Sequence, residues 1–255
     1  KPHVPFLAPD KYFDLYPYNK IRYQIDRPNM WDFLPPSALS KRYEAFGFQF
    51  SKENHILRKE YMQAYHACIS FIDAQLGLVL DGLKKNGLWE DTIIIFTSDH
   101  GYHLGDHFIW GKVTLFDIGS KVPFILRAPG ISKSGANSEA MVELIDIYPT
   151  LADLAGLEAP NHLQGTSLRP LLGQPERLGK RKYAYSVVTR GPQNLGYALR
   201  NQDWRYGKWP DGEELYNLRN DPHEKKNLAQ KEHLKERLDV FRKALAKQQA
   251  LIQQN

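Results

Sequence analysis

Residues 92–101 read TIIIFTSDHG and form the most informative stretch of the chain. Apolar residues run from Ile93 to Phe96 without alternation, a pattern typical of a strand that is buried on both faces of a parallel sheet. Asp99 and His100 follow at once, at the carboxyl end of this strand. Open α/β sheets bind ligands at that end, because the loops there extend beyond the edge of the sheet. The stretch therefore predicts an α/β fold with a cation or anion site at these two residues. The alternative is an ordinary polar loop in which Asp99 caps a neighbouring backbone and the histidines are solvated.

The residues before this strand are expected to form a loop region followed by one long helix. Seven prolines precede residue 37 and interrupt any helical period, so residues 1–60 are expected to form a long ordered loop with one short helix. Apolar side chains then repeat every three or four residues from Glu60 to Asn86, which predicts an amphipathic helix ending before Gly87.

The alternation of helices and strands continues after the polar loop. Residues 122–127 form a second apolar run, which predicts another buried strand. Residues 145–155 predict a short helix that is closed by Gly156. Helices and strands that alternate in this way are typical of an α/β domain.

Beyond Pro175 the sequence changes character. Short tyrosine-rich segments separated by turn residues predict a small antiparallel sheet. These segments cover residues 183–189, 196–200 and 204–208. Apolar residues on one face of residues 231–254 predict a helix that packs against this sheet. We therefore expect two domains, an α/β part over residues 1–175 and a small α+β subdomain over residues 176–255.

Composition excludes several classes of protein. The 255 residues are 42% hydrophobic and 25% charged, which is typical of a globular chain. No apolar run approaches the roughly 18–20 residues of a membrane span, so none is expected. The net charge of +5 is modest and the basic residues are dispersed, so nucleic-acid binding is not expected. The only cysteine, Cys68, excludes an internal disulfide and is expected to be a small core residue of the predicted helix.

Five stretches, in this order along the chain, resemble the sulfatase family, and most closely its iduronate-2-sulfatase-like branch. The stretches are KPHVPF at residues 1–6; FID at 71–73 with TIIIFTSDHG at 92–101; WGK at 110–112; DIYPTL at 146–151 with GTSL at 165–168; and ELYNL at 214–218, followed by DP at 221–222 and NLA at 227–229. They span nearly the whole sequence and match the C-terminal part of a sulfatase.

The resemblance implies an alkaline-phosphatase-like sheet sandwiched by helices and a catalytic formylglycine. Sulfatases form this group from the Cys or Ser of a C-x-P-x-R motif, and the chain contains no such motif, because Cys68 is followed by ISFI. The resemblance therefore places the formylglycine upstream of Lys1, in an N-terminal segment of the same enzyme. Without that segment the site is expected to be catalytically incomplete.

The resemblance also implies a metal site. Asp99 matches a metal-binding carboxylate of the family, and His100 matches the ligand next to it. The family usually binds Ca²⁺, and many members have Asn where this chain has His100. Calcium prefers oxygen donors, so the histidine nitrogen leaves another divalent cation open. The alternative is that His100 only caps the loop.

Two further residues match groups that bind the sulfate. Lys112 matches a lysine whose fixed ammonium stabilises the negative charge that develops on the bridging oxygen during ester cleavage. His3 matches a histidine that reaches the same oxygen, where an imidazolium can donate a proton to the departing alkoxide. The alternative is that His3 belongs to a frayed terminus. His103 and His107 either line the sugar pocket or are simple surface residues. We expect Asp99, His100, His3 and Lys112 to converge above the end of the 92–97 strand.

The leading interpretation is a sulfuric ester hydrolase that acts on sulfated carbohydrates, with a 2-O-sulfated uronate as the substrate that the branch suggests. One alternative is a phosphoester or phosphonate hydrolase of the same superfamily. Another is a non-catalytic carbohydrate-binding homologue that keeps the fold. The sequence has no N-x-S/T sequon, which favours a periplasmic or secreted enzyme over a glycosylated lysosomal one.

Overall fold

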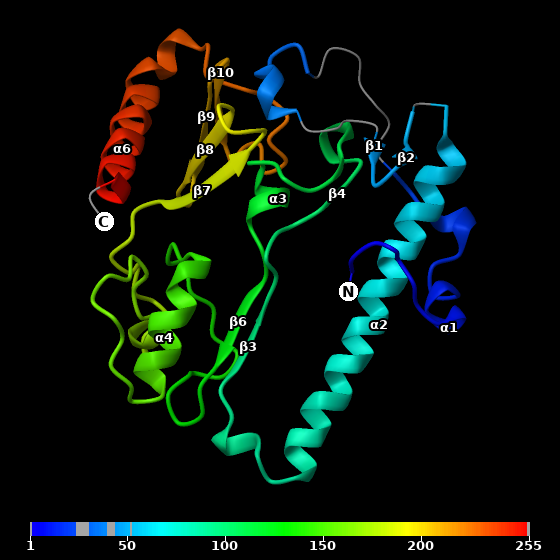
Figure 1. Ribbon diagram of the computed structural model, residues 1–255, viewed down its shortest axis with the longest axis vertical. Coiled ribbons are helices and arrows are strands. Elements are labelled where there is room, and N and C mark those ends of the chain that lie inside the picture. The colour runs from blue at the N-terminus through cyan, green and yellow to red at the C-terminus, as the bar shows by residue number, and fades with distance from the viewer. Residues whose placement is uncertain (1, 24–30, 40–43, 52, 254–255) are drawn as a thin grey trace. The chain divides into compact units, whose positions relative to one another are not determined.

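The computed structural model of the chain describes residues 2–23, 31–39, 44–51 and 53–253 and is shown in Figure 1. The chain divides into two compact units, each built from segments that are distant in sequence. The first comprises Lys1–Pro28, Ser40–Thr92 and Tyr102–Lys112; the second comprises Asn29–Leu39, Ile93–Gly101 and Val113–Asn255. The domain boundary expected at residue 175 lies inside the second unit and stays a prediction.

The helix α2 (His55–Lys85) is the main element of the first unit. The side chain of Asn54 caps it by accepting a hydrogen bond from the N–H of Leu57 over 3.2 Å. This cap starts the helix earlier than the expected Glu60, because a cap lies outside the apolar periodicity that predicted the helix. Gly87 follows the helix in the left-handed region, with φ of +70°, as expected for a stop signal.

By length and composition alone, α2 is also apolar enough to cross a membrane, since one 18-residue window has a mean hydropathy of 1.2. One such helix is weak evidence, because the core helix of a globular domain meets the same criterion. Composition had suggested no span, and that expectation stays a prediction. Cys68 lies in α2 and is fully buried, which confirms it as a core residue.

An aromatic cluster forms the core of the first unit. The ring of Phe50 stacks on Trp110 with centroids 4.6 Å apart and meets Tyr61 of α2 edge-on at 4.7 Å. All three side chains are buried. Trp110 belongs to β5 (Trp110–Gly111), which pairs with β4 (His103–Leu104). The packing of Trp110 therefore fixes the strand that leads directly to Lys112.

Short elements complete the first unit. Among its described residues before α2, the expected loop region contains one short α-helix, two 3-10 turns and a two-stranded antiparallel pair, which agrees with a mostly irregular segment that holds one short helix. These elements are α1 (Asp10–Phe13), the 3-10 turns Tyr18–Lys20 and Pro36–Ala38, of which the latter belongs to the second unit, β1 (Glu44–Ala45) and β2 (Phe48–Gln49).

In the second unit, the expected buried strands are present as β3 (Ile94–Thr97) and β6 (Phe124–Arg127). They pair with each other in antiparallel register, with Ile94 opposite Arg127, so the expected parallel pairing is wrong for these two strands. Within this chain the two strands are not buried on both faces, because Phe96 is 39% and Ile125 is 63% exposed. A continuous apolar run predicts that both faces of a strand are hydrophobic. It does not predict whether the strand runs parallel or antiparallel to its neighbour, because that depends on which strand it pairs with.

The short helix expected over residues 145–155 is confirmed as α4 (Ile147–Leu154), preceded by the 3-10 turn Leu144–Asp146. Gly156 closes it with φ of +68°. A further short helix, α5 (Arg169–Gly173), follows in the same unit.

The expected antiparallel sheet is confirmed and has the strand order β10-β9-β8-β7. Its strands are β7 (Ala184–Thr189), β8 (Leu195–Arg200), β9 (Trp204–Trp209) and β10 (Gly212–Asn217). The sequence did not predict β10, which pairs with β9 across a hairpin that places Gly212 opposite Trp209.

The C-terminal helix α6 (Lys235–Gln253) packs on this sheet, as expected, and Figure 1 shows it beside the strands. Buried side chains from both elements form one hydrophobic cluster, which comprises Leu199, Tyr206, Leu215, Leu238, Phe241 and Leu245. Each element buries the apolar face of the other, which is why the sheet and the helix occur together.

Candidate functional site

Asp99 and His100 form one polar pair directly after β3. The carboxylate of Asp99 accepts a hydrogen bond from the backbone N–H of His100 over 3.0 Å. Its second oxygen lies 3.4 Å from Nε2 of His100, and its side chain is 83% exposed. The hydroxyl of Ser98 donates to the carbonyl of His100 over 2.8 Å and fixes the turn. The loop therefore presents an oxygen and a nitrogen donor side by side.

The lowered pKa of Asp99 favours binding of a cation. Slight burial acts to raise the pKa of Asp99, but the adjacent His100 and the hydrogen bonds to the carboxylate hold that pKa below its usual value. Nδ1 of His100 lies 2.9 Å from the carbonyl of Gly101. A carbonyl only accepts, so Nδ1 carries a hydrogen and Nε2 is the ring nitrogen on the side of Asp99.

These donors fit part of a divalent-cation shell. Calcium takes about six to eight oxygen ligands and magnesium takes six ligands in octahedral geometry, so two side chains do not complete either shell. Among the residues that the structure describes, no group of three or more His, Cys, Asp or Glu side chains could hold a metal. Asp99 and His100 could therefore contribute two ligands, with the others supplied elsewhere.

A close approach to α3 (Asp117–Ser120) fixes the position of the loop. The backbone N–H of Gly101 donates to the carbonyl of Gly119 over 3.0 Å. A Cβ on Gly101 would collide with the carbonyl oxygen of Ile118, so only glycine fits at this position. The residue that follows His100 is thus held against α3.

His3 and Lys112 lie in the first unit, whereas Asp99 and His100 lie in the second. His3 is exposed, and its Nδ1 bonds to the carbonyl of Val4 over 2.8 Å. Lys112 is half-buried, and its ammonium forms no hydrogen bond or ion pair with any side chain in the described parts of the chain. Both residues are available to an anionic group. Their expected convergence with Asp99 and His100 stays a prediction.

His103 and His107 are buried, so neither is a simple surface residue. Their rings lie 5.9 Å apart, and Nδ1 of His103 bonds to the carbonyl of Asp106 over 2.9 Å. Burial lowers the pKa of His103, so this ring is neutral near pH 7. His107 has φ of +55°, a left-handed conformation that is unusual for a residue with a side chain. A role for His107 in sugar binding stays a prediction.

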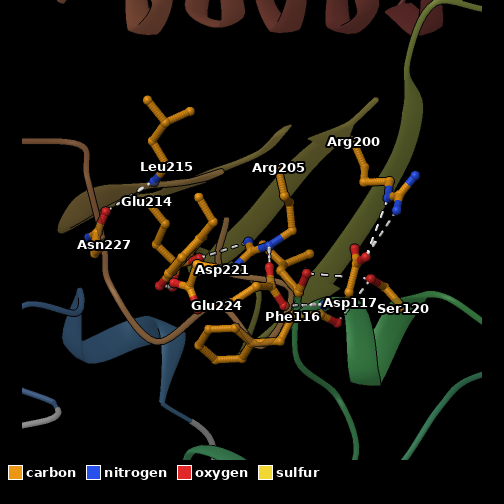
Figure 2. Close-up of polar contacts among 12 residues, drawn as sticks. Phe116, Asp117, Ser120, Arg200, Arg205, Glu214, Leu215, Asp221, Glu224 and Asn227 are labelled. Atoms are coloured by element: carbon orange, nitrogen blue, oxygen red, sulfur yellow. Dashed lines mark hydrogen bonds and ion pairs between the residues drawn. The ribbon is translucent and has the colours of Figure 1, made fainter. Parts of the chain in front are cut away.

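Sequence reasoning missed a buried ionic cluster in the second unit, which comprises Arg205, Glu214 and Glu224 (Figure 2). All three side chains are nearly inaccessible to solvent. The only signal was that Glu214 lies among apolar residues of the ELYNL stretch. Charged residues are rarely buried without partners, and these partners are too far apart in sequence to be paired by inspection.

Two family models match the chain. Residues 1–157 match the family described as Sulfatase, and residues 105–251 match the family described as N-sulphoglucosamine sulphohydrolase, C-terminal. Together they cover almost the whole chain.

Similar proteins are described as sulfatases. A protein described as a sulfatase in Formosa agariphila is 36% identical and matches 98% of this chain and 48% of its own length. Iduronate 2-sulfatase of Mus musculus is 31% identical over 82% of this chain and 50% of its own length. The chain therefore spans about half the length of the curated relatives that it matches.

A solved structure shares the fold of nearly the whole chain. Phosphonate monoester hydrolase of Agrobacterium radiobacter is 27% identical, with a TM-score of 0.84 over 98% of this chain and 55% of that protein. Structures of sulfatases are also similar, which confirms the expected alkaline-phosphatase-like fold class.

Proposed function

The chain belongs to the sulfatase family, and on that premise we propose that it supplies the metal-binding and sulfate-binding part of an enzyme that hydrolyses sulfate esters of sugars. The observation that carries this proposal is the Asp99–His100 pair at the end of β3, where a carboxylate lies 3.4 Å from a ring nitrogen. The family resemblance supports a metal at these same two residues.

In the proposed mechanism, Asp99 and His100 hold a divalent cation, for which we propose Ca²⁺. Sulfatases generally use a divalent metal together with a formylglycine. When bound, the cation would supply positive charge beside the oxygens of the sulfate. The part played by Asp99 is to remain ionised near neutral pH, and its lowered pKa favours this state.

Lys112 and His3 are proposed to act on the sulfate ester itself. Cleavage places negative charge on the oxygen that leaves with the sugar. The ammonium of Lys112 stabilises that charge, and a protonated His3 donates a proton to the departing oxygen. The products are then a free sugar hydroxyl and sulfate. His107 is proposed to contribute to sugar binding. The formylglycine nucleophile is proposed to lie in an N-terminal segment of the same enzyme.

The proposed substrate is a sulfated carbohydrate, with a 2-O-sulfated uronate as the first candidate. It is suggested by the similarity to iduronate 2-sulfatase, which extends over 82% of this chain. We propose a periplasmic or secreted location, because the sequence has no N-glycosylation sequon.

A second candidate is hydrolysis of phosphonate or phosphate esters. It is favoured by the structural likeness to a phosphonate monoester hydrolase, which extends over 98% of the chain. A cation and a fixed ammonium would also stabilise the negative charge on phosphoryl oxygens.

The two candidates are separated by assaying the full-length enzyme on both classes of ester. The expected result is a kcat/KM for a 2-O-sulfated uronate disaccharide at least a hundredfold above that for an aryl phosphonate. A faster reaction with the phosphonate would favour the second candidate. Binding of the disaccharide without hydrolysis of either ester would favour a non-catalytic homologue.

A further inference from the structure

The buried ionic cluster of Arg205, Glu214 and Glu224 provides a rigid anchor in the second unit. Arg205 extends from β9; its Nε donates to Glu224, and its Nη1 donates to Glu214 over 3.0 Å (Figure 2). The guanidinium also lies over the ring of Tyr216, 4.7 Å from its centroid. Moving any one of these charges would leave a partner buried and unpaired, so the cluster resists displacement.

This anchor holds the start of α3. Oε2 of Glu224 accepts the backbone N–H of Asp117, the first residue of α3, over 2.6 Å. Arg200 of β8 donates to the carboxylate of Asp117 from Nε and Nη2, both over 3.3 Å (Figure 2). The guanidinium of Arg205 lies 5.0 Å from the ring centroid of Phe116, the residue before the helix. The C-terminal sheet therefore contacts α3 through its backbone and its side chains.

In turn, α3 fixes the loop that carries Asp99 and His100. Gly101 donates its N–H to the carbonyl of Gly119 over 3.0 Å, and there is no room for a Cβ between Gly101 and Ile118. A shift of α3 toward the loop would collide with Gly101, and a shift away would break the hydrogen bond. Either movement would displace the residue next to His100.

We propose that Glu224 is a positioning residue for the cation site, acting through Asp117 and α3 on the Asp99–His100 pair. This inference rests on the proposed function, in which that pair binds a divalent cation. Glu224 itself touches neither Asp99 nor His100, and its role is to place them.

Two properties of Glu224 support this role. Its φ is +51°, a left-handed conformation that a residue with a side chain rarely adopts and that surrounding contacts must maintain. Burial raises the pKa of Glu224 to about 7, while Arg205 and the N–H of Asp117 favour its charged form. A buried carboxylate in a strained backbone is unfavourable as a packing element, so a positional requirement explains its presence better.

Glu224→Ala in the full-length enzyme tests the inference, with Glu143→Ala as the matched control. Glu143 is also largely buried, accepts the backbone N–H of Tyr185 over 2.7 Å and lies 3.4 Å from Nε of Arg181. It thus makes the same types of contact as Glu224, but toward β7 and not toward α3. Loss of a largely buried carboxylate that accepts a backbone N–H is common to both variants, and the contact with α3 belongs to Glu224.

Two measurements apply to each variant: hydrogen–deuterium exchange at the Gly101 amide in the metal-free enzyme, and the Kd for Ca²⁺ by equilibrium dialysis. For Glu224→Ala we expect exchange at least tenfold faster and a Kd at least tenfold higher. For Glu143→Ala we expect both within threefold of the wild type. If Glu224→Ala does not fold, Arg200→Gln removes the other polar hold on Asp117 and should change both quantities in the same direction, by at least threefold.

Wild-type values for both quantities in the tested variant would overturn the inference, as would equal changes in Glu143→Ala. A wild-type enzyme that binds no Ca²⁺, Mg²⁺ or Mn²⁺ would instead overturn the cation role in the proposed function, and the positioning of a cation site with it. The exchange rate at Gly101 distinguishes the two failures, because it needs no metal.

Discussion

The backbone N–H of Gly101 donates to the carbonyl of Gly119 over 3.0 Å, and the neighbouring carbonyl of Ile118 leaves no space for a side chain on Gly101. This contact joins the loop that carries the candidate cation ligands to α3. It makes the loop's position sensitive to a single methyl group.

Gly101→Ala should therefore destabilise the full-length enzyme by about 2 kcal/mol or more, as expected for overpacking against backbone that cannot yield. Gly77→Ala in α2 is the control. Among the described residues, no atom apart from the local backbone of α2 and the two chain neighbours lies within 4 Å of the added methyl, and alanine is favoured over glycine in a helix by roughly 0.5–1 kcal/mol. Thermal unfolding of both variants checks this prediction, which fails if Gly101→Ala melts as high as the wild type.

Lys112→Ala should lower kcat by roughly a hundredfold or more with little effect on folding, on the scale of losing one preorganised contact to a developing oxyanion. The loss should be smaller for an aryl sulfate, whose leaving group is already acidic, than for a sugar sulfate. Steady-state kinetics on both substrates measure the two ratios. Equal losses together with a lower melting temperature would identify Lys112 as a structural residue.

His103 should make stability depend on pH in the acid range. Burial lowers its pKa in the folded state, whereas a histidine in the unfolded chain titrates near pH 6.5. Below that pH the unfolded chain binds more protons, so stability falls with decreasing pH by up to about 1.4 kcal/mol per pH unit. His103→Gln should flatten this dependence, and the exposed His233→Gln should follow the wild type. Denaturant unfolding between pH 4.5 and 7.5 checks this, and parallel curves for wild type and His103→Gln would contradict it.

Phe241→Ala should remove much of the packing between α6 and the sheet. Phe241 is 2% exposed and stacks on Tyr206 with ring centroids 5.8 Å apart, so truncation should cost about 3–5 kcal/mol. Val240 on the same helix is 51% exposed, and Val240→Ala should change stability by less than about 0.5 kcal/mol. Chemical denaturation compares them, and similar small effects would show that α6 does not stabilise the sheet.

The sequence predicted elements whose pattern is local. The interior of α2 and the packed face of α6 follow from the spacing of apolar residues, and the C-terminal sheet follows from its β-forming segments. Asp99 and His100 were predictable as a pair because they are adjacent and follow an apolar run.

What the sequence did not predict depends on contacts between distant residues. The antiparallel pairing of β3 with β6 is set by which strands meet and not by the composition of either. The Arg205–Glu224 pair could not be predicted from the sequence, because each residue considered alone is expected to be a solvated charge. The contact between α3 and Gly101 likewise could not be predicted, because a glycine after His100 is also compatible with an ordinary turn.

The proposed function requires that Asp99 and His100 bind a divalent cation beside the sulfate that His3 and Lys112 contact. A crystal structure of the full-length enzyme with Ca²⁺ and a sulfated uronate disaccharide tests it most directly. An Asp99 oxygen is expected to lie about 2.3–2.6 Å from the cation, and the ammonium of Lys112 is expected to lie about 2.7–3.2 Å from a sulfate oxygen. A structure that places the Asp99 and Lys112 side chains on opposite faces of the protein would contradict it.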